Sequence, residues 1–183
     1  MGCDIHQYNL IWKDGLYHLE GEGVFGLEHK KYRAEGLDDL DDDSWIYKSD
    51  YLIEMVPGRS YINFGVLAGV RSSEFEIEDR QDGYPGELFG VVDEKQFYKM
   101  TEDCHSPVWY FLPQLRASLL NAAHECAAYI ASWSRFAGNE QPEEYEWLMK
   151  SIKRMIDGID TAKAELGSKE AYRKSIVMFN FDS

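Results

Sequence analysis

The chain has 183 residues, 44% of them hydrophobic, so it can bury one core, and a single domain covering residues 1–183 is the default expectation. It carries 19 Lys and Arg against 33 Asp and Glu, a net charge of −14. This charge opposes extended contact with nucleic-acid phosphates or an anionic membrane surface. A small anionic ligand, held in a local arginine or metal pocket, stays compatible with it.

The sequence gives no sign of export or membrane insertion. It has no apolar run of about 18 residues, and its start lacks the basic and then apolar order of a signal peptide. Its three cysteines are too few for a disulfide framework and fit reduced thiols. We therefore expect a cytoplasmic protein without a membrane partner.

Residues 3–12 are predicted to form a strand followed by a hairpin. Side chains alternate along a strand, so Asp4 and His6 share one face with Tyr8. Asp14-Gly15 is a strong two-residue turn signal. Residues 16–19 should therefore return antiparallel beside the first strand.

The middle of the chain mixes irregular segments with one buried helix. Residues 20–45 are polar and glycine-rich, and the acidic run at 37–44 lacks the order of a calcium loop, which favours a solvated loop. Residues 60–71 fit a short buried helix slightly better than a strand, and Arg59 and Arg71 bracket it. Residues 72–102, with a turn at 82–86, predict an irregular insert typical of a lid or binding loop.

Two helices and a strand are predicted to complete the chain. Apolar residues recur at helical spacing from Leu112 onward, and a second helix opening at Pro142 gives an antiparallel hairpin over about 112–166, with Gly167 ending the helical region. Residues 175–181 predict a terminal strand in which Asn180 and Asp182 share a face. The fold class is α+β, an antiparallel or mixed sheet that includes both terminal strands and is covered by the helical pair.

Two Asp-x-His triplets, Asp4 to His6 and Asp103 to His105, are the main chemical feature. On extended backbone each triplet projects a carboxylate and an imidazole from one face, which suits a divalent zinc, manganese or iron ion. A metal with an open position ionises bound water or clamps a phosphoryl oxygen. The alternative interpretation makes His6 and His105 hydrogen-bonded structural residues.

Two further interpretations are weaker. Cys3 and His6 face opposite sides of a regular strand, which disfavours a thiolate zinc site. The aromatic run at Trp109 could stack a nucleobase, but aromatics that precede a long amphipathic helix are more often part of a core.

The opening Met-Gly-Cys-Asp-Ile-His resembles a family of small, largely uncharacterised proteins of phage and bacterial genomes. Further segments carry the same resemblance: 59–61 with 64–71, 83–85, 103–106 with Trp109, and 177–182. The resemblance implies that the two triplets, Arg59, Arg71 and Asp182 belong to one constellation, and it supplies no established activity. The chain departs from the family at Pro107-Val108, where many relatives are expected to carry His-Ser, so a third histidine ligand is absent.

These observations predict a metal-dependent hydrolase of a phosphate-containing small molecule, such as a nucleotide or nucleotide-like signal. The metal ligands are Asp4, His6, Asp103 and His105. Asp182 and His105 are the predicted catalytic residues, with Asp182 as a fifth ligand or a base. Arg59 and Arg71 bind phosphate through bidentate hydrogen bonds, and Trp109 forms a pocket wall.

Two alternatives stay open at this point. One is a non-catalytic phage protein that binds and sequesters a nucleotide signal with the same residues. The other is a structural or interaction protein in which the motifs hold the fold. In a phage-encoded protein, the compartment would be the cytoplasm of the bacterial host.

Overall fold

The computed structural model of the chain describes residues 4–21, 31–32, 46–47, 61–69, 77, 79–85, 105–136 and 143–182. Its strands are β1 (Asp4–Lys13), β2 (Leu16–Gly21), β3 (Lys31–Tyr32), β4 (Ile46–Tyr47), β5 (Gln81–Asp82), β6 (His105–Phe111) and β7 (Ile176–Asp182). Its helices are α1 (Tyr61–Ala68), α3 (Leu112–Phe136), α4 (Glu143–Glu165) and α5 (Lys169–Lys174). The acidic run at 37–44 lies outside the described residues.

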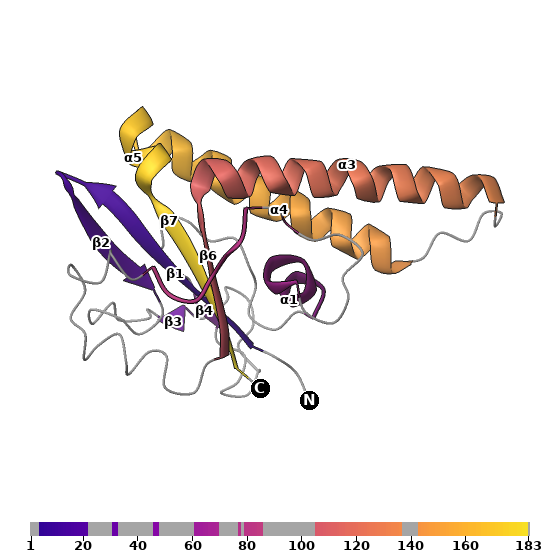
Figure 1. Cartoon of the computed structure of the whole chain (residues 1–183), viewed down its shortest axis with the longest axis horizontal. Coiled ribbons are helices and arrows are strands. Elements are labelled where there is room, and N and C mark those ends of the chain that lie inside the picture. Colours follow the sequence, from indigo (N-terminus) through magenta and orange to yellow (C-terminus); the bar gives the residue numbers. More distant parts are fainter. Residues whose placement is uncertain are drawn as a thin grey trace.

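A five-stranded sheet in the order β2-β1-β7-β6-β5 forms the base of the fold, and all of its pairings are antiparallel. The helices α3 and α4 lie along one side of this sheet (Figure 1). The short strands β3 and β4 pair with each other in a separate sheet. The predicted α+β class, with both terminal strands in the sheet and a helical pair over it, is confirmed.

The β1–β2 hairpin turns at the two residues that the sequence indicates. Asp14 and Gly15 both have positive φ, 54° and 82°. Two successive positive φ values are typical of the hairpin turn whose twist matches that of the flanking strands, and Asp and Gly tolerate this conformation best. Lys13 therefore pairs with Leu16, and the register of the hairpin is fixed from there.

The central strand β7 is buried on both faces. Val177, Phe179 and Phe181 pack into the core with the helices. Ile176 and Met178 pack on the opposite face against Tyr8 and Leu10 of β1. The alternation predicted for β7 is confirmed at these positions.

The helices α3 and α4 form the predicted antiparallel hairpin. Arg116, near the start of α3, donates two hydrogen bonds of 2.7 and 2.9 Å to the carboxylate of Asp160, near the end of α4. At the other end, Cys126 of α3 contacts the carbonyl oxygen of Tyr145 of α4. Among the described helices, none combines the length and apolar character needed to cross a membrane.

Three elements differ from the sequence prediction. The sequence predicts only an extended stretch before the helix that begins at Leu112, whereas the structure has the strand β6 there. Residues 72–102 are not wholly irregular, because Gln81 and Asp82 pair with Trp109 and Val108 as β5. Gly167, at φ 67°, ends α4 as predicted, but the helical region continues in α5, whose N-terminal cap is Ser168, accepting a hydrogen bond of 2.9 Å from the amide of Ala171.

The ion pair across the helical hairpin predicts a pH-dependent contribution to stability. The hydrogen bonds from Arg116 hold the pKa of Asp160 below its ordinary value. Stability from a lowered carboxyl pKa is present above the ordinary value and is lost as pH falls through the lower, folded-state value. We expect Asp160→Asn to lower the free energy of unfolding by about 0.5–1 kcal/mol at neutral pH, since solvent screens a partly exposed pair.

Urea unfolding at neutral and at acid pH measures this effect. The difference between Asp160→Asn and the wild type should disappear at acid pH. Asp157→Asn is the matched control, because its pair with Lys153 lies on the surface of α4 alone, with both side chains more than half exposed. An equal loss for Asp160→Asn at both pH values would show that the carboxylate charge is not the cause.

Candidate functional site

Three segments that carry predicted site residues meet at one end of the sheet. In the β1–β7 ladder, Asp4 lies opposite Asp182 and His6 lies opposite Asn180. On the other side of β7, His105 of β6 lies opposite Phe181. The start of β1 and the end of β7 lie side by side at this end of the sheet (Figure 1). The backbone thus brings residues 4–6, His105 and residues 180–182 onto three adjacent strands.

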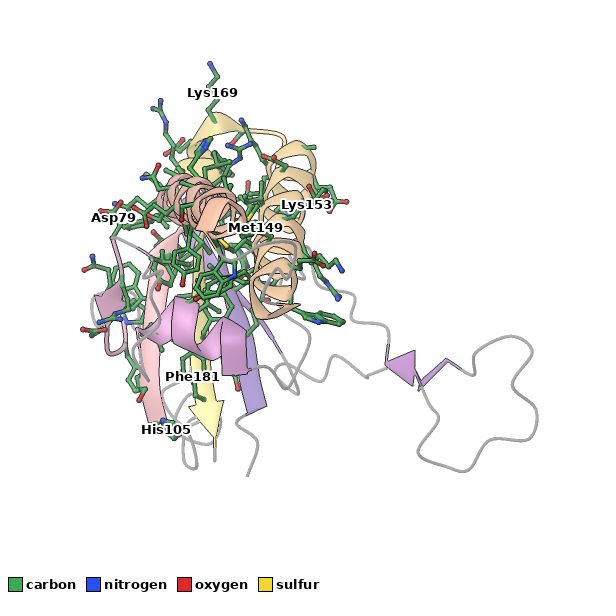
Figure 2. All side chains as sticks on the ribbon, turned by 90° about the vertical axis from the view of Figure 1, so that its right-hand side faces the viewer. Asp79, His105, Met149, Lys153, Lys169 and Phe181 are labelled. Carbon is green, nitrogen blue, oxygen red and sulfur yellow. The ribbon has the colours of Figure 1, made fainter. Side chains whose placement is uncertain are left out.

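The histidines of the two triplets lie neither in the same row nor on the same face of the sheet. His6 shares a row with Asn180, whereas His105 shares the neighbouring row, on the opposite face, with Ile5 and Phe181. The side chain of His105 is exposed, and its Nδ1 lies 3.1 Å from Oγ of Ser106. Figure 2 shows His105 and Phe181 at the end of the sheet that is distant from α3 and α4.

Several predicted site residues lie outside the described part. These are Arg59, Arg71 and Asp103 as whole residues, and the side chains of Asp4, His6 and Asp182. The predicted metal ligand set therefore stays a prediction. Among the side chains that are described, no group of three His, Cys, Asp or Glu residues is placed to hold a metal ion.

A β-bulge interrupts β6 beside the central strand. β6 has two residues, Ser106 and Pro107, where β7 has the single Asn180. Ser106 has a positive φ of 51°, the conformation of the first residue of a G1-type bulge, where glycine is the usual residue. Proline lacks an amide hydrogen and is tolerated in a sheet at such a position. The carbonyl oxygen of Pro107 accepts a hydrogen bond of 2.9 Å from the amide of Gly83, the residue that follows β5.

Asn180 is the residue at this end of the sheet that sequence analysis did not select. Its side chain is 0% exposed, and neither Oδ1 nor Nδ2 has a hydrogen-bond partner in the described structure. A buried polar group without a partner costs about 1–3 kcal/mol, and native proteins retain few of them. The signal in the sequence was a single amide within the otherwise apolar run 176–181.

The buried polar residues of β1 show a contrasting arrangement. Gln7 and Asn9 are 9% and 1% exposed. They lie on the opposite face of the sheet from position 180, and Nε2 of Gln7 donates a hydrogen bond of 2.9 Å to Oδ1 of Asn9. The chain thus supplies an internal partner for these two amides and none for Asn180 among the described residues.

The C-terminal end of α1 is anchored to β6 and β5. The hydroxyl of Tyr110 donates a hydrogen bond to the carbonyl oxygen of Leu67. Nη1 of Arg80 donates to the carbonyl oxygen of Ala68 at 2.7 Å, while its Nε donates to Asp82 at 2.8 Å. These side chains satisfy carbonyl groups that a helix end leaves without intrahelical partners.

Glycine is strongly favoured at the residue that follows α1. Gly69 has a φ of 62°, and a Cβ atom there would lie 1.9 Å from Nη1 of Arg80. The helix predicted for residues 60–71 is confirmed over Tyr61–Ala68, and its last residue lies three positions before Arg71. Burial raises the pKa of Tyr110, so its hydroxyl stays protonated as a hydrogen-bond donor.

Trp109 lies on the sheet face that also carries position 180. It is opposite Met178 in the β6–β7 ladder and packs against the cluster of Tyr8, Leu10, Ile176 and Met178. Its ring contacts that of Phe111 edge to face, with centroids 5.5 Å apart. The neighbouring Tyr110 is fully buried and belongs to the core, as the alternative interpretation of this aromatic run predicted.

A cleft of about 530 Å³ lies at the other end of β1, between the hairpin turn and the junction of α4 with α5. Its lining includes Trp12, Lys13, Glu165 and Glu170, and it contains none of the predicted site residues. The ammonium group of Lys174 lies 4.2 Å from the centre of the Trp12 ring. This cleft is separate from the end of the sheet at which positions 6, 105 and 180 lie.

Comparison of the chain with protein-family models, with curated proteins and with solved structures finds no match.

The anchor of α1 predicts a specific loss of stability. Tyr110→Phe removes the hydroxyl and leaves the carbonyl group of Leu67 without this partner in a buried place. We expect the free energy of unfolding to fall by about 1–3 kcal/mol. Urea unfolding measures the change. Tyr17→Phe is the matched control, because Tyr17 is only partly buried, and it should change stability by about 0.5 kcal/mol or less. Equal effects in the two variants would contradict the anchoring role.

Proposed function

We propose that the chain is a metal-dependent hydrolase acting on a phosphate-containing small molecule, such as a nucleotide or nucleotide-like signal. The observation that carries the proposal is the register of the sheet. It brings residues from the start, the later middle and the end of the sequence to one end of β1, β6 and β7. Neighbouring strands lie about 4.8 Å apart. His6 and His105 belong to opposite faces of the sheet, so an ion shared by both would lie at the end of the three strands.

In this proposal Asp4, His6, Asp103 and His105 hold a zinc, manganese or iron ion. Asp182, opposite Asp4 in the ladder, is a fifth ligand or the base, and His105 takes part in catalysis. A divalent ion in such a site lowers the pKa of a bound water and stabilises charge on a phosphoryl oxygen. The exposure of His105 supports this role, because a reacting group must be reachable by substrate.

In this proposal Arg59 and Arg71 bind the phosphate group, and Trp109 forms a wall of the pocket. A net charge of −14 repels an anionic substrate, so a site for one needs local positive charge. The metal and two arginines supply that charge, and the guanidinium group suits bidentate contact with phosphate. The anchored end of α1 supports the role of Arg71, since it fixes the backbone at Leu67 and Ala68, a few residues earlier in the chain.

Metal content tests the proposal directly. We expect the purified protein to bind a stoichiometric divalent ion, and His6→Ala and His105→Ala to weaken that binding by roughly 10-fold or more. Elemental analysis and metal titration measure both. His124→Ala is the matched control, because His124 is exposed on α3, away from this end of the sheet. If the two variants keep their fold and bind metal as the wild type does, His6 and His105 are not metal ligands.

A second function is favoured by Asn180. An amide donates and accepts hydrogen bonds but does not transfer protons at ordinary pH, which suits recognition of a ligand. A protein that captures a nucleotide signal without altering it would use the same arginines and the same aromatic wall. In that case Asp4, His6 and His105 would hydrogen-bond the ligand.

Incubation with a panel of nucleotides distinguishes the two functions. The protein is incubated with each nucleotide and a divalent metal, then denatured, and the released compounds are separated and identified. Altered product that is missing with His6→Ala indicates hydrolysis. Intact nucleotide released on denaturation, in amounts stoichiometric with the protein, indicates capture.

A further inference from the structure

Position 180 lies between the parts of the proposed site. On one side it is opposite His6 of β1, and on the other it faces the Ser106–Pro107 bulge of β6. Directly opposite residues of an antiparallel pair have Cβ atoms about 4.5–5.5 Å apart on the same face of the sheet. Positions 4, 6, 180 and 182 therefore form a block of two adjacent pairs on one face.

The buried amide of Asn180 makes no hydrogen bond within the described structure. Neither of its polar atoms has a partner there, although the side chain is 0% exposed. The residues beside it in β7, such as Met178, Phe179 and Phe181, are apolar and equally buried. An apolar residue at position 180 would fit this strand without an unpartnered polar group. The amide is therefore suited to a partner outside the described part of the structure.

The block also has a defined chemical character. Asp4, Asp182 and Asn180 are oxygen-bearing residue types, and His6 supplies one nitrogen. Oxygen-rich sets suit manganese among the three metals considered, whereas zinc more often takes nitrogen and sulfur ligands. An asparagine beside such an ion can offer Oδ1 to the cation and Nδ2 to an anion held by the same cation.

We propose that Asn180 is a ligand-binding residue of this site, with Oδ1 directed to a manganese ion and Nδ2 donating a hydrogen bond to a phosphoryl oxygen. The proposal rests on the metal and phosphate ligands of the proposed function, but it does not depend on turnover. It shifts the centre of the site from the row of His105 to the row of His6.

The test uses the full chain with Mn²⁺ alone and with Mn²⁺ plus inorganic phosphate. Thermal unfolding and isothermal titration follow both ligands. The wild type should gain in melting temperature with Mn²⁺ and gain again with phosphate. Asn180→Leu should melt no lower than the wild type without ligand, because an unpartnered amide is removed, but should bind Mn²⁺ about 10- to 100-fold more weakly.

Asn180→Asp tests the roles of Oδ1 and Nδ2 separately. It keeps an oxygen for the cation and loses the donor for phosphate, so Mn²⁺ should still raise the melting temperature while phosphate adds nothing. Asn180→Asp therefore tests the role of the amide even if Asn180→Leu does not fold. Gln114→Met is the matched control, because Oε1 of Gln114, on α3, is also buried without a partner in the described structure. It should leave both ligand responses unchanged.

The outcomes separate this inference from the proposed function. Wild-type binding of Mn²⁺ and phosphate by Asn180→Leu would overturn the role of Asn180 and leave the hydrolase proposal standing. Binding that is lost in Asn180→Leu, in a protein that hydrolyses no nucleotide, would support the role and overturn the hydrolase. A wild type that responds to Zn²⁺ but not to Mn²⁺ would overturn the oxygen-rich assignment. A ligand-free Asn180→Leu less stable than the wild type, with Gln114→Met unaffected, would show that the amide serves the fold.

Discussion

The burial of β7 between β1 and β6 is the constraint on which the rest of the structure depends. β7 pairs with a strand on each side and packs side chains on both faces, so both layers of the fold meet on it. Ser175, just before it, connects its start to two other elements. The carbonyl oxygen of Ser175 accepts from the amide of Leu112 at 3.1 Å, and its Oγ accepts from the amide of Trp12 at 3.0 Å. One residue thus sets the start of α3 and the end of β1 relative to the central strand.

Elements with strong local signals could be predicted from the sequence, and elements defined by pairing could not. The turn at Asp14-Gly15 and the two long helices rest on residue types and periodicity within the segment itself. β6 escaped prediction because Pro107 and the bulge interrupt its alternation, and because it runs directly into α3 at Leu112. β5 has only two residues, and its strand character comes from the partner that it pairs with. Such an element has no period that a sequence could reveal.

Only part of the candidate site could be predicted from the sequence, for a similar reason. The sequence identified polar residues in extended segments, and the register then placed Asp4, His6, Asp182 and His105 at one end of the sheet. It treated both triplets as regular extended backbone, whereas the bulge at Ser106–Pro107 places His105 opposite Phe181, on the other face of the sheet from His6. Asn180 was overlooked because its burial and its unpartnered amide are tertiary properties. Arg59, Arg71 and Asp103 lie outside the described residues, so their predicted roles rest on the sequence alone.

The position of β7 in the chain also governs when the protein acquires its structure during synthesis. Trp12 and Ser175, which are joined by a hydrogen bond, are 163 positions apart. Contacts of such long range are slow to form, because a large loop must close before they contribute. Until residues 176–182 emerge from the ribosome, β1 lacks its β7 partner, and Tyr8 and Leu10 lack their contacts with Ile176 and Met178, which favours aggregation of the incomplete chain. A truncated chain without β7 would lack both the core and the meeting point of the polar residues.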